Sequence, residues 1–365
     1  MRINNLILYN FKNHSQFSIS LNADINCITG KNGSGKTNIL DAIYLLGTCK
    51  SYFNPIDYQL IRHNETTASL NAQFEGSSSF DLQMVIEQGK KKKLKNNGKQ
   101  YEKLVDHIGL INVIMITPDD IELIKGNSEE RRRFLDITIS QTDRMYLNCL
   151  SDYQKIVEQR NKQLKLFAQH NHFDQVIIDS YNHKLIPPAK YIHEKRQLAL
   201  LRLQELFNKY YLEIQSGNET VRLNYISELN TTSFETLLAE SLKKDMILER
   251  TTTGIHKDDL SFEIDGFPIK KFGSQGQNKS FIIALKLAQH QYLAEIDNQK
   301  PILLLDDIFE KIDEERAEKL IDLVCAQNFG QIIITDTHSE RVRKYFDNKN
   351  KSINFVELNL PKQND

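Results

Sequence analysis

The stretch GKNGSGKT at residues 30–37 constrains the fold of this 365-residue chain more than any other feature. It matches the pattern G-x-x-x-x-G-K-[ST] completely, and it lies between a strand-like run, INCIT, and a helix-like run, NILDAIYLLG. A strand, a glycine-rich turn and a helix in this order are the context in which the pattern forms a phosphate-binding loop, or P-loop. We therefore expect a phosphate site at the edge of a parallel α/β sheet.

The residue types in this loop each have a chemical reason. The glycines let the backbone curl so that successive N–H groups point at phosphate oxygens. Lys36 reaches the outer phosphates as a point charge, and Thr37 offers a hydroxyl to Mg²⁺. The residues expected to contact the bound nucleotide here are Gly30, Lys31, Asn32, Gly33, Ser34, Gly35, Lys36, Thr37 and Asn38.

A second motif, PILLLDD at residues 301–307, supplies the carboxylates that a P-loop site needs. We expect Asp306 to complete the Mg²⁺ shell with Thr37, and Asp307 to polarise the attacking water. Lys36 and Asp307 are thus the expected catalytic residues. The alternative is a buried strand that ends in a solvated acidic turn. The P-loop beside it favours the metal-site interpretation.

A third motif, GSQGQ at residues 273–277, precedes the apolar helical run FIIALKLAQHQYL. Ser274 is either a helix cap or part of an anion site at the helix N-terminus. The order and spacing of the three motifs resemble those of ABC-type ATPases, whose signature turn reads Leu-Ser-Gly-Gly-Gln. This resemblance implies that ATP is the ligand and joins a homodimer. The resemblance implies that Ser274, Gly276 and Gln277 contact the γ-phosphate bound by the partner subunit. It also implies that Asp313, in the D-loop, links the two subunits.

Further sequence blocks along the whole chain resemble the RecF family of bacterial repair ATPases, which is related to the SMC-type heads. The blocks are LYNFKN (8–13), NILDA (38–42), TPDD (117–120), RRRFLD (131–136), QRN (159–161), GIHKDDL (254–260) and LLDD (304–307). The resemblance implies an α/β, ABC-type P-loop ATPase head with a helical second lobe and no long coiled coil. It also implies weak, DNA-dependent ATP hydrolysis, ATP-dependent dimerisation, and binding to gapped DNA or to junctions of single- and double-stranded DNA. The resemblance further implies that the chain works with RecR and RecO and helps to load the RecA recombinase.

The chain departs from the family pattern at two places. The family reads Gly-Pro-His-Arg-Asp-Asp where this chain has Ile255 and Lys257, and a lysine keeps the charge but loses the bidentate geometry of arginine. ABC-type proteins often carry Thr-His after the last strand as a switch. Here Asp336 follows Thr335, and His338 comes two places late. Which of Asp336 and His338 acts as the switch stays open, and no Q-loop glutamine is assigned.

The chain is expected to have three parts. Residues 1–115 and 251–365 form the ATPase lobe, and residues 116–250 form a mainly helical insertion. Apolar spacing predicts helices over 119–215, interrupted at Pro187-Pro188, and strand-like runs return over 221–267. The heptads are too short and irregular for a long coiled coil.

Charge is nearly balanced, with 47 basic and 48 acidic side chains, which argues against a uniformly basic surface but allows local basic patches. The run GKKKKLKNNGK at residues 89–99 is either a solvated hairpin tip or a phosphate contact. For Arg131-Arg132-Arg133, beside Glu129 and Glu130, we expect intrahelical ion pairs. Any DNA contact is expected to be to the backbone and to depend strongly on salt.

The remaining features bear on location and on rival functions. No apolar run approaches 18 residues, and the start lacks the pattern of a signal peptide, so a cytoplasmic protein is expected. Four distant cysteines suggest neither a zinc site nor a disulfide framework. A transporter nucleotide-binding subunit fits the helical insertion poorly. A nuclease-linked ATPase would need a further domain, for which the short tail after Asp336 leaves no room.

Overall fold

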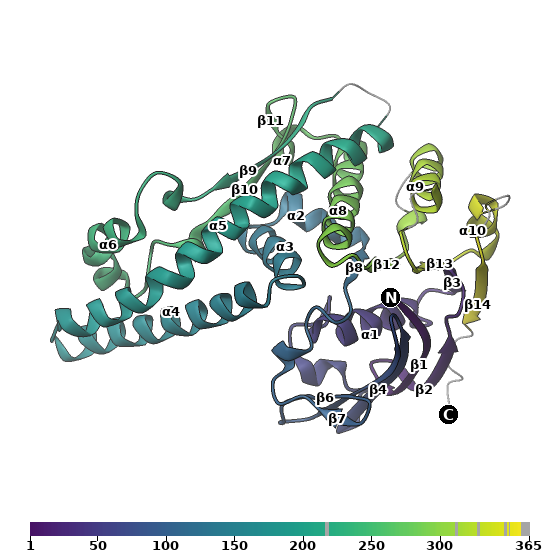
Figure 1. Ribbon diagram of the computed structural model, residues 1–365, viewed down its shortest axis with the longest axis horizontal. Helices are drawn as coiled ribbons and strands as arrows, with labels where there is room; N and C mark the ends of the chain where they lie inside the picture. Colours follow the sequence, from purple (N-terminus) through teal and green to yellow (C-terminus); the bar gives the residue numbers. More distant parts are fainter. Residues whose placement is uncertain (216–218, 311–312, 327–328, 347–348, 350, 359–365) are drawn as a thin grey trace. The chain divides into compact units, whose positions relative to one another are not determined.

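The computed structural model describes residues 1–215, 219–310, 313–326, 329–346, 349 and 351–358. The chain divides into two compact units, whose elements can be found by their labels in Figure 1. Unit 1 comprises residues 1–121, 209–218 and 275–365, and unit 2 comprises 122–208 and 219–274. Unit 2 reaches residue 274, beyond the expected boundary at 250, because strand β10 (Asp259–Ile264) pairs with β9 (Val221–Ile226).

The parallel sheet of unit 1 has the strand order β14-β3-β13-β12-β8. All four pairings are parallel, and the register sets Leu305 opposite both Ile116 and Ile334. The carboxyl ends of the strands therefore meet at one edge of the sheet, where the P-loop and the Asp-Asp pair follow. The strands are β3 (Ile25–Gly30), β8 (Val113–Ile116), β12 (Ile302–Leu305), β13 (Ile332–Asp336) and β14 (Ile353–Leu358).

A second sheet in unit 1 is antiparallel, in the order β2-β1-β4-β5-β6-β7. Buried and exposed residues alternate along β4 and β5, as expected for strands with one face on a core. The strands are β1 (Arg2–Phe11), β2 (His14–Ser20), β4 (Thr67–Glu75), β5 (Ser79–Glu87), β6 (Lys93–Asn96) and β7 (Lys99–Gln100).

Helix α1 (Lys36–Thr48) fills the core between these sheets, and its apolar side chains pack with residues of β1, β4 and β5 as well as β8 and β12. Burial on nearly every side explains why the run NILDAIYLLG shows no polar face. The other helices of unit 1 are η1 (Asp57–Leu60), η2 (Leu104–Asp106), η3 (Pro118–Ile121), α8 (Gln275–Asp297), η6 (Ile308–Glu310), α9 (Glu314–Ala326) and α10 (Ser339–Phe346).

Unit 2 is mainly helical, with a small antiparallel sheet ordered β11-β10-β9. Its two long helices, α4 and α5, are joined by a short connection and pack through Leu164, Phe167 and Ile178. The elements are α2 (Glu122–Lys125), α3 (Ser128–Ser140), α4 (Arg144–His170), α5 (Gln175–Ile214), η4 (Glu228–Asn230), α6 (Phe234–Leu248), η5 (Ile255–Lys257), β11 (Phe267–Pro268) and α7 (Ile269–Phe272). No described helix is long and apolar enough to cross a bilayer.

One expectation about the insertion is wrong. Helix α5 runs through Pro187-Pro188 without a break. The prolines remove the amide partners of the His183 and Lys184 carbonyls, and both of those residues are exposed, so water can hydrate the carbonyls. Residues 234–248, between the two expected strands, form helix α6, with a Ser233 cap and buried Phe234 and Leu238 at helical spacing. The strands at VRLNYIS and LSFEIDG are confirmed.

The structure also shows the contacts of the two basic stretches, residues 131–133 and 89–99. Arg131 does not pair within its helix. Its Nε and Nη2 atoms contact both carboxylate oxygens of Asp259 at 2.7 and 3.0 Å, because β10 packs against α3. The lysine run forms the hairpin of β5, β6 and β7, with Asn97 and Gly98 at positive φ in the predicted Asn-Gly turn.

Candidate nucleotide-binding site

The P-loop connects β3 to α1 and is curled tightly on itself. Gly33 and Gly35 have φ angles of 82° and 96°, which favour glycine. The buried Lys36 ammonium donates at 2.8 Å to the Gly30 carbonyl, and a Cβ atom added to Gly30 would lie 2.7 Å from the Leu358 carbonyl oxygen. Strand β14 thus closes one side of the loop, and the lysine bridges its turns.

The turn between β1 and β2 braces the other side of the P-loop. The Asn13 amide donates to the Gly33 carbonyl at 3.3 Å and accepts from Asn38 at 2.7 Å. The His14 ring contacts the Gly35 carbonyl at 3.2 Å, and burial lowers the pKa of His14. A neutral His14 therefore donates from Nε2 to this carbonyl.

The hydroxyls of Thr37 and Thr335 converge on one carboxylate oxygen of Asp306. They donate at 3.0 and 2.7 Å, from α1 and from β13. Burial and then the Asp307 charge raise the pKa of Asp306 to about 6, although both hydroxyls partly offset this shift. A buried carboxylate with this environment favours a nearby cation.

The donors at this point fit Mg²⁺. The protein offers one hydroxyl and one carboxylate on adjacent atoms, and Mg²⁺ typically takes one or two protein oxygens and completes its shell with phosphate and water. Among the residues that the structure describes, no group of three or more His, Cys, Asp or Glu side chains is arranged as a metal cage. Thr37 and Asp306, expected from the sequence as the metal ligands, lie side by side.

Asp307 follows Asp306 in a left-handed backbone conformation, with φ 44°. Its amide donates to the Thr335 hydroxyl at 3.0 Å, and its side chain is half-buried. Aspartate tolerates this conformation better than most residues do, and such strain is common at functional sites. The turn directs the two neighbouring carboxylates differently.

The two candidate switch residues differ in burial: Asp336, at the end of β13, is buried, and His338 is exposed. The buried Asp336 carboxylate accepts from the His338 amide at 2.7 Å and pairs with Arg341 at 2.7 Å. Asp336 therefore fixes the start of α10. His338 is exposed, and its Nδ1 atom lies 2.8 Å from the Thr337 hydroxyl.

The signature turn lies at the start of α8. Ser274 is exposed and directly precedes Gln275, the first residue of the helix. A Cβ atom added to Gly276 would lie 3.0 Å from the Arg316 guanidinium, and Arg316 Nε donates to Ser280 at 2.9 Å. Gln277 is half-buried in the first turn.

The exposed Asp313 caps α9 by accepting from the Arg316 amide at 3.0 Å and also pairs with the Arg316 side chain. Residues 311–312 of the same motif, EKID, lie outside the described residues.

The strand beside β12 ends in a loop that contains no glutamine. After β8 the chain reads Thr117-Pro118-Asp119-Asp120, and the Asp306 amide donates to Ile116 at 2.9 Å at this point. The buried Asp120 pairs with Lys286 of α8 at 2.7 Å. The edge strand β8, next to the strand that precedes Asp306, is thus tied to the helix that begins after Ser274.

Three side chains of this site escaped sequence reasoning: Thr335, Asn13 and His14. Thr335 is the last residue but one of the buried run QIIITD, and its place near the carboxyl end of a buried strand was the available signal. Asn13 stood inside the block LYNFKN but had no assigned role. No local pattern marks His14.

Comparisons with known proteins agree with this geometry. The model of the RecF/RecN/SMC N-terminal domain family matches residues 2–359. The DNA replication and repair protein RecF of Flavobacterium johnsoniae is 48% identical over 342 residues, covering 93% of this chain and 95% of the relative. RecF of Cytophaga hutchinsonii is 41% identical over 352 residues, covering 96% and 93%.

Solved structures are similar as well. The recombination mediator protein RecF-ATP of the RecFOR pathway superposes with a TM-score of 0.86 at 26% identity, covering 92% of both chains. The Smc head bound to the C-winged helix domain of ScpA has a TM-score of 0.55 at 17% identity, covering 92% of this chain and 90% of that one. The similarity to the Smc head indicates a shared fold only.

Proposed function

The chain belongs to the RecF family of ABC-type ATPase heads, and on that premise we propose that it is an ATP-switched DNA repair and replication protein. It binds ATP with Mg²⁺, dimerises on ATP, hydrolyses ATP slowly in a DNA-dependent way, and helps load the RecA recombinase at gaps or junctions. The observation that carries this proposal is the Thr37–Asp306–Thr335 cluster at the mouth of a complete P-loop.

The phosphates of ATP are held by the loop residues 30–38. The curled backbone offers its N–H groups to the phosphate oxygens, and Lys36 exchanges its carbonyl contacts for the outer phosphates. Bound Mg²⁺ would supply positive charge that offsets the negative charge of the phosphate oxygens. Thr37 and Asp306 provide its protein oxygens, and Asp307 orients the attacking water as catalytic base.

The signature turn acts on a second copy of the chain. Ser274 is exposed at the N-terminus of a 23-residue helix, where N–H groups and the helix dipole favour an anion. Ser274, Gly276 and Gln277 contact the γ-phosphate held by the partner's P-loop, and the exposed Asp313 faces the partner. ATP bound between two such half-sites holds the dimer together.

The names of the relatives support DNA as a ligand, and the family resemblance suggests the finer choice of partners. Those relatives are named as DNA replication and repair proteins, and the solved one as a recombination mediator of the RecFOR pathway. The proposed ligands are gapped DNA and single/double-strand junctions, bound through the backbone. The proposed partners are RecR and RecO, in the cytoplasm.

Sedimentation equilibrium of the full chain with and without Mg-ATP tests the switch. We expect a monomer that becomes a dimer with Mg-ATP, and no dimer for Ser274→Arg. Ser233→Arg is the matched control, since Ser233 is also an exposed serine that precedes a helix, but in a cap contact with Thr236. If both variants dimerise like the unmodified chain, Ser274 is only a helix cap and the trans site is refuted.

A further inference from the structure

The connection from α6 to β10, residues 249–258, is held at its beginning by a buried arginine of α4. Arg160 Nη1 donates to Asp245 at 2.7 Å and to the Thr251 hydroxyl at 2.9 Å, and Arg160 and Asp245 are fully buried. Asp245 also accepts from the Thr252 amide at 2.8 Å. We call residues 249–258 the anchored loop.

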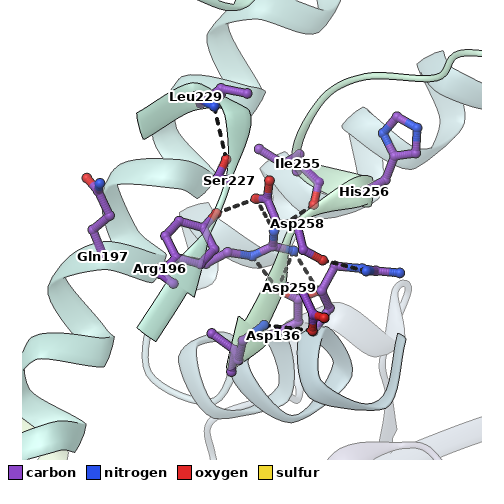
Figure 2. Close-up of polar contacts among 12 residues, drawn as sticks. Asp136, Arg196, Gln197, Ser227, Leu229, Ile255, His256, Asp258 and Asp259 are labelled. Carbon is purple, nitrogen blue, oxygen red and sulfur yellow. Dashed lines mark hydrogen bonds and ion pairs between the residues drawn. The ribbon is translucent and has the colours of Figure 1, made fainter. Parts of the chain in front are cut away.

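A second buried arginine, from α5, holds the end of the anchored loop. Arg196 donates to the Ile255 carbonyl at 2.8 Å and to Asp258 at 3.0 Å, while also pairing with Asp136 of α3 at 2.9 Å. Figure 2 shows Arg196 reaching between these groups from its helix. These buried contacts to both ends of the loop fix its backbone conformation.

The middle of the anchored loop is packed against Tyr153 of α4. A Cβ atom on Gly254 would lie 2.5 Å from the tyrosine oxygen, and that oxygen lies 2.8 Å from His256 Nδ1. Burial lowers the pKa of His256 to about 4, so this histidine is neutral near pH 7. It supports the loop without adding charge.

This scaffold exposes a group of cations, which we call the basic cluster: Arg132, Lys244, Arg250 and Lys257. Lys244, Arg250 and Lys257 are exposed, and Arg132 is half-buried. The Arg132 guanidinium donates at 2.5 Å to the Asp258 carbonyl, next to Lys257. The Arg250 amide donates at 3.1 Å to the Asp245 carbonyl, next to Lys244. These hydrogen bonds bring Arg132 and Lys244 to the anchored loop, and the charges of the other three cations lie within electrostatic range of Lys257.

The positive charge of the basic cluster is not neutralised locally. Lys244, Arg250 and Lys257 form no ion pair with any residue that the structure describes. The pKa of Lys257 is lowered, first by burial and then by the charges of Arg250 and Arg132. The lysine hairpin differs, because Lys92 pairs with Asp57, and both Lys90 and Lys93 pair with Glu87.

We propose that the basic cluster binds the phosphates of a nucleic-acid backbone. The proposal rests on the DNA-directed function proposed above and adds the residues that make the contact. Arg250 and Lys257 lie on the anchored loop and Lys244 on helix α6, so the backbone that carries the three exposed cations needs no ordering when phosphates bind. The hydroxyls of Thr251 and Thr252 and the His256 ring are engaged inside the unit, which leaves charges rather than base-reading groups on the surface.

The test is the binding of the full chain, with Mg-ATP, to a gapped 30-base-pair duplex as salt is varied. The variant is Lys244→Glu/Arg250→Glu/Lys257→Glu. The control is Lys91→Glu/Lys99→Glu/Lys103→Glu, which changes three exposed lysines outside unit 2 by the same net charge. We expect the slope of log K against log salt to flatten by roughly 2–3 in the cluster variant, with affinity falling at least about tenfold at 50 mM salt. The control should stay within about threefold of the unmodified chain.

Other outcomes overturn the proposal in distinguishable ways. If the unmodified chain does not bind the duplex, the proposed function itself fails. If it binds and the cluster variant keeps the same affinity and slope, the phosphates contact another surface. If poly-glutamate binds the unmodified chain and not the variant, while duplex binding is unaltered, the basic cluster serves an acidic protein. Retained ATP binding and an unchanged circular dichroism spectrum show that each variant is folded.

Discussion

The Thr335 hydroxyl donates a 2.7 Å hydrogen bond to the carboxylate of Asp306, joining the ends of two neighbouring strands at the nucleotide site. The same hydroxyl accepts a hydrogen bond of 3.0 Å from the Asp307 amide. One side chain therefore sets the position of both acidic residues. The ABC-type switch histidine has no counterpart at the next position, and Thr335 supplies an ordered contact to the acidic pair instead.

Removing that hydroxyl should slow ATP turnover more than it weakens ATP binding. Thr335→Val loses a hydrogen bond to a charged group, worth about 1.5–3 kcal/mol, so we expect kcat to fall roughly 10- to 100-fold. Thr335→Ser keeps the hydroxyl and should stay close to the unmodified rate. Single-turnover hydrolysis and nucleotide titration separate the two effects. A proportional loss of affinity instead would assign Thr335 to ground-state binding.

The contact between Gly35 and the β1–β2 turn predicts a strong effect of a single methyl group. An added Cβ would lie 2.5 Å from His14 Nε2, at a φ of 96°. Gly35→Ala should therefore abolish ATP binding in a fluorescent-nucleotide titration. Gly98→Ala carries similar backbone strain at φ 79°, but nothing lies within 4 Å of its Cβ. We expect this control to cost about 1 kcal/mol of stability and to bind ATP normally.

The buried carboxylate of Asp306, beside Asp307, predicts that one substitution has opposite effects on thermal stability with and without Mg²⁺. Asp306→Asn removes a buried charge beside Asp307 while keeping an acceptor for Thr37 and Thr335. The melting temperature should rise in EDTA and should lose its increase on adding Mg-ATP. Differential scanning calorimetry in both buffers measures this. A Mg-ATP increase equal to that of the unmodified chain would show that Asp306 is not a metal ligand.

A buried histidine predicts acid sensitivity. His290 contacts the Pro301 carbonyl at 3.0 Å, and burial lowers its pKa to about 4. Because this pKa lies below the unfolded value of 6.5, the unfolded chain takes up the proton first. The free energy of unfolding should thus fall from pH 6.5 to pH 4, by up to about 3 kcal/mol from this group.

His290→Gln should flatten the pH dependence of urea unfolding over that window. The difference between the two chains isolates this group from the carboxylates, which titrate in both. Identical slopes between pH 6.5 and pH 4 would contradict the prediction.

The pair that anchors the loop in unit 2 predicts a large stability effect. Arg160→Met leaves Asp245 charged and buried without its partner, which costs about 3–5 kcal/mol. Lys155→Met breaks the exposed pair with Asp152 on the same helix and should behave nearly like the unmodified chain. Urea unfolding, combined with limited proteolysis of the two long helices, compares them. Equal stability of both variants would contradict the assigned role of Arg160.

Local patterns predicted the parts of the fold whose cause is local. The P-loop, the buried strands around it and helix α3 follow from glycine positions and apolar spacing, and the structure has them. The partner of Arg131 is Asp259, 128 residues away, and no spacing rule connects them. The same holds for Thr335 and Asp306, which meet because their strands pair in one particular register.

One error came from a rule that tertiary structure overrides, and one helix was left unassigned. A double proline usually ends a helix, but α5 continues because the affected carbonyls face solvent. Residues 234–248 lie between two strands, yet Phe234, Leu238 and Leu242 repeat every four residues and mark one helical face. That spacing was present in the sequence and was the signal to follow.

Strand β3 lies between β13 and β14, so the P-loop strand is flanked by segments from the far end of the chain. The Ile3 amide likewise bonds to Gln331, 328 residues later. During synthesis at about 5–20 residues per second, the nascent P-loop waits roughly 15–60 s for its neighbouring strands. Unit 2 is complete by residue 274 and can fold in that interval. The nucleotide site is therefore among the last parts of the molecule to form, and a ribosome that stalls before β13 releases a chain unable to assemble it.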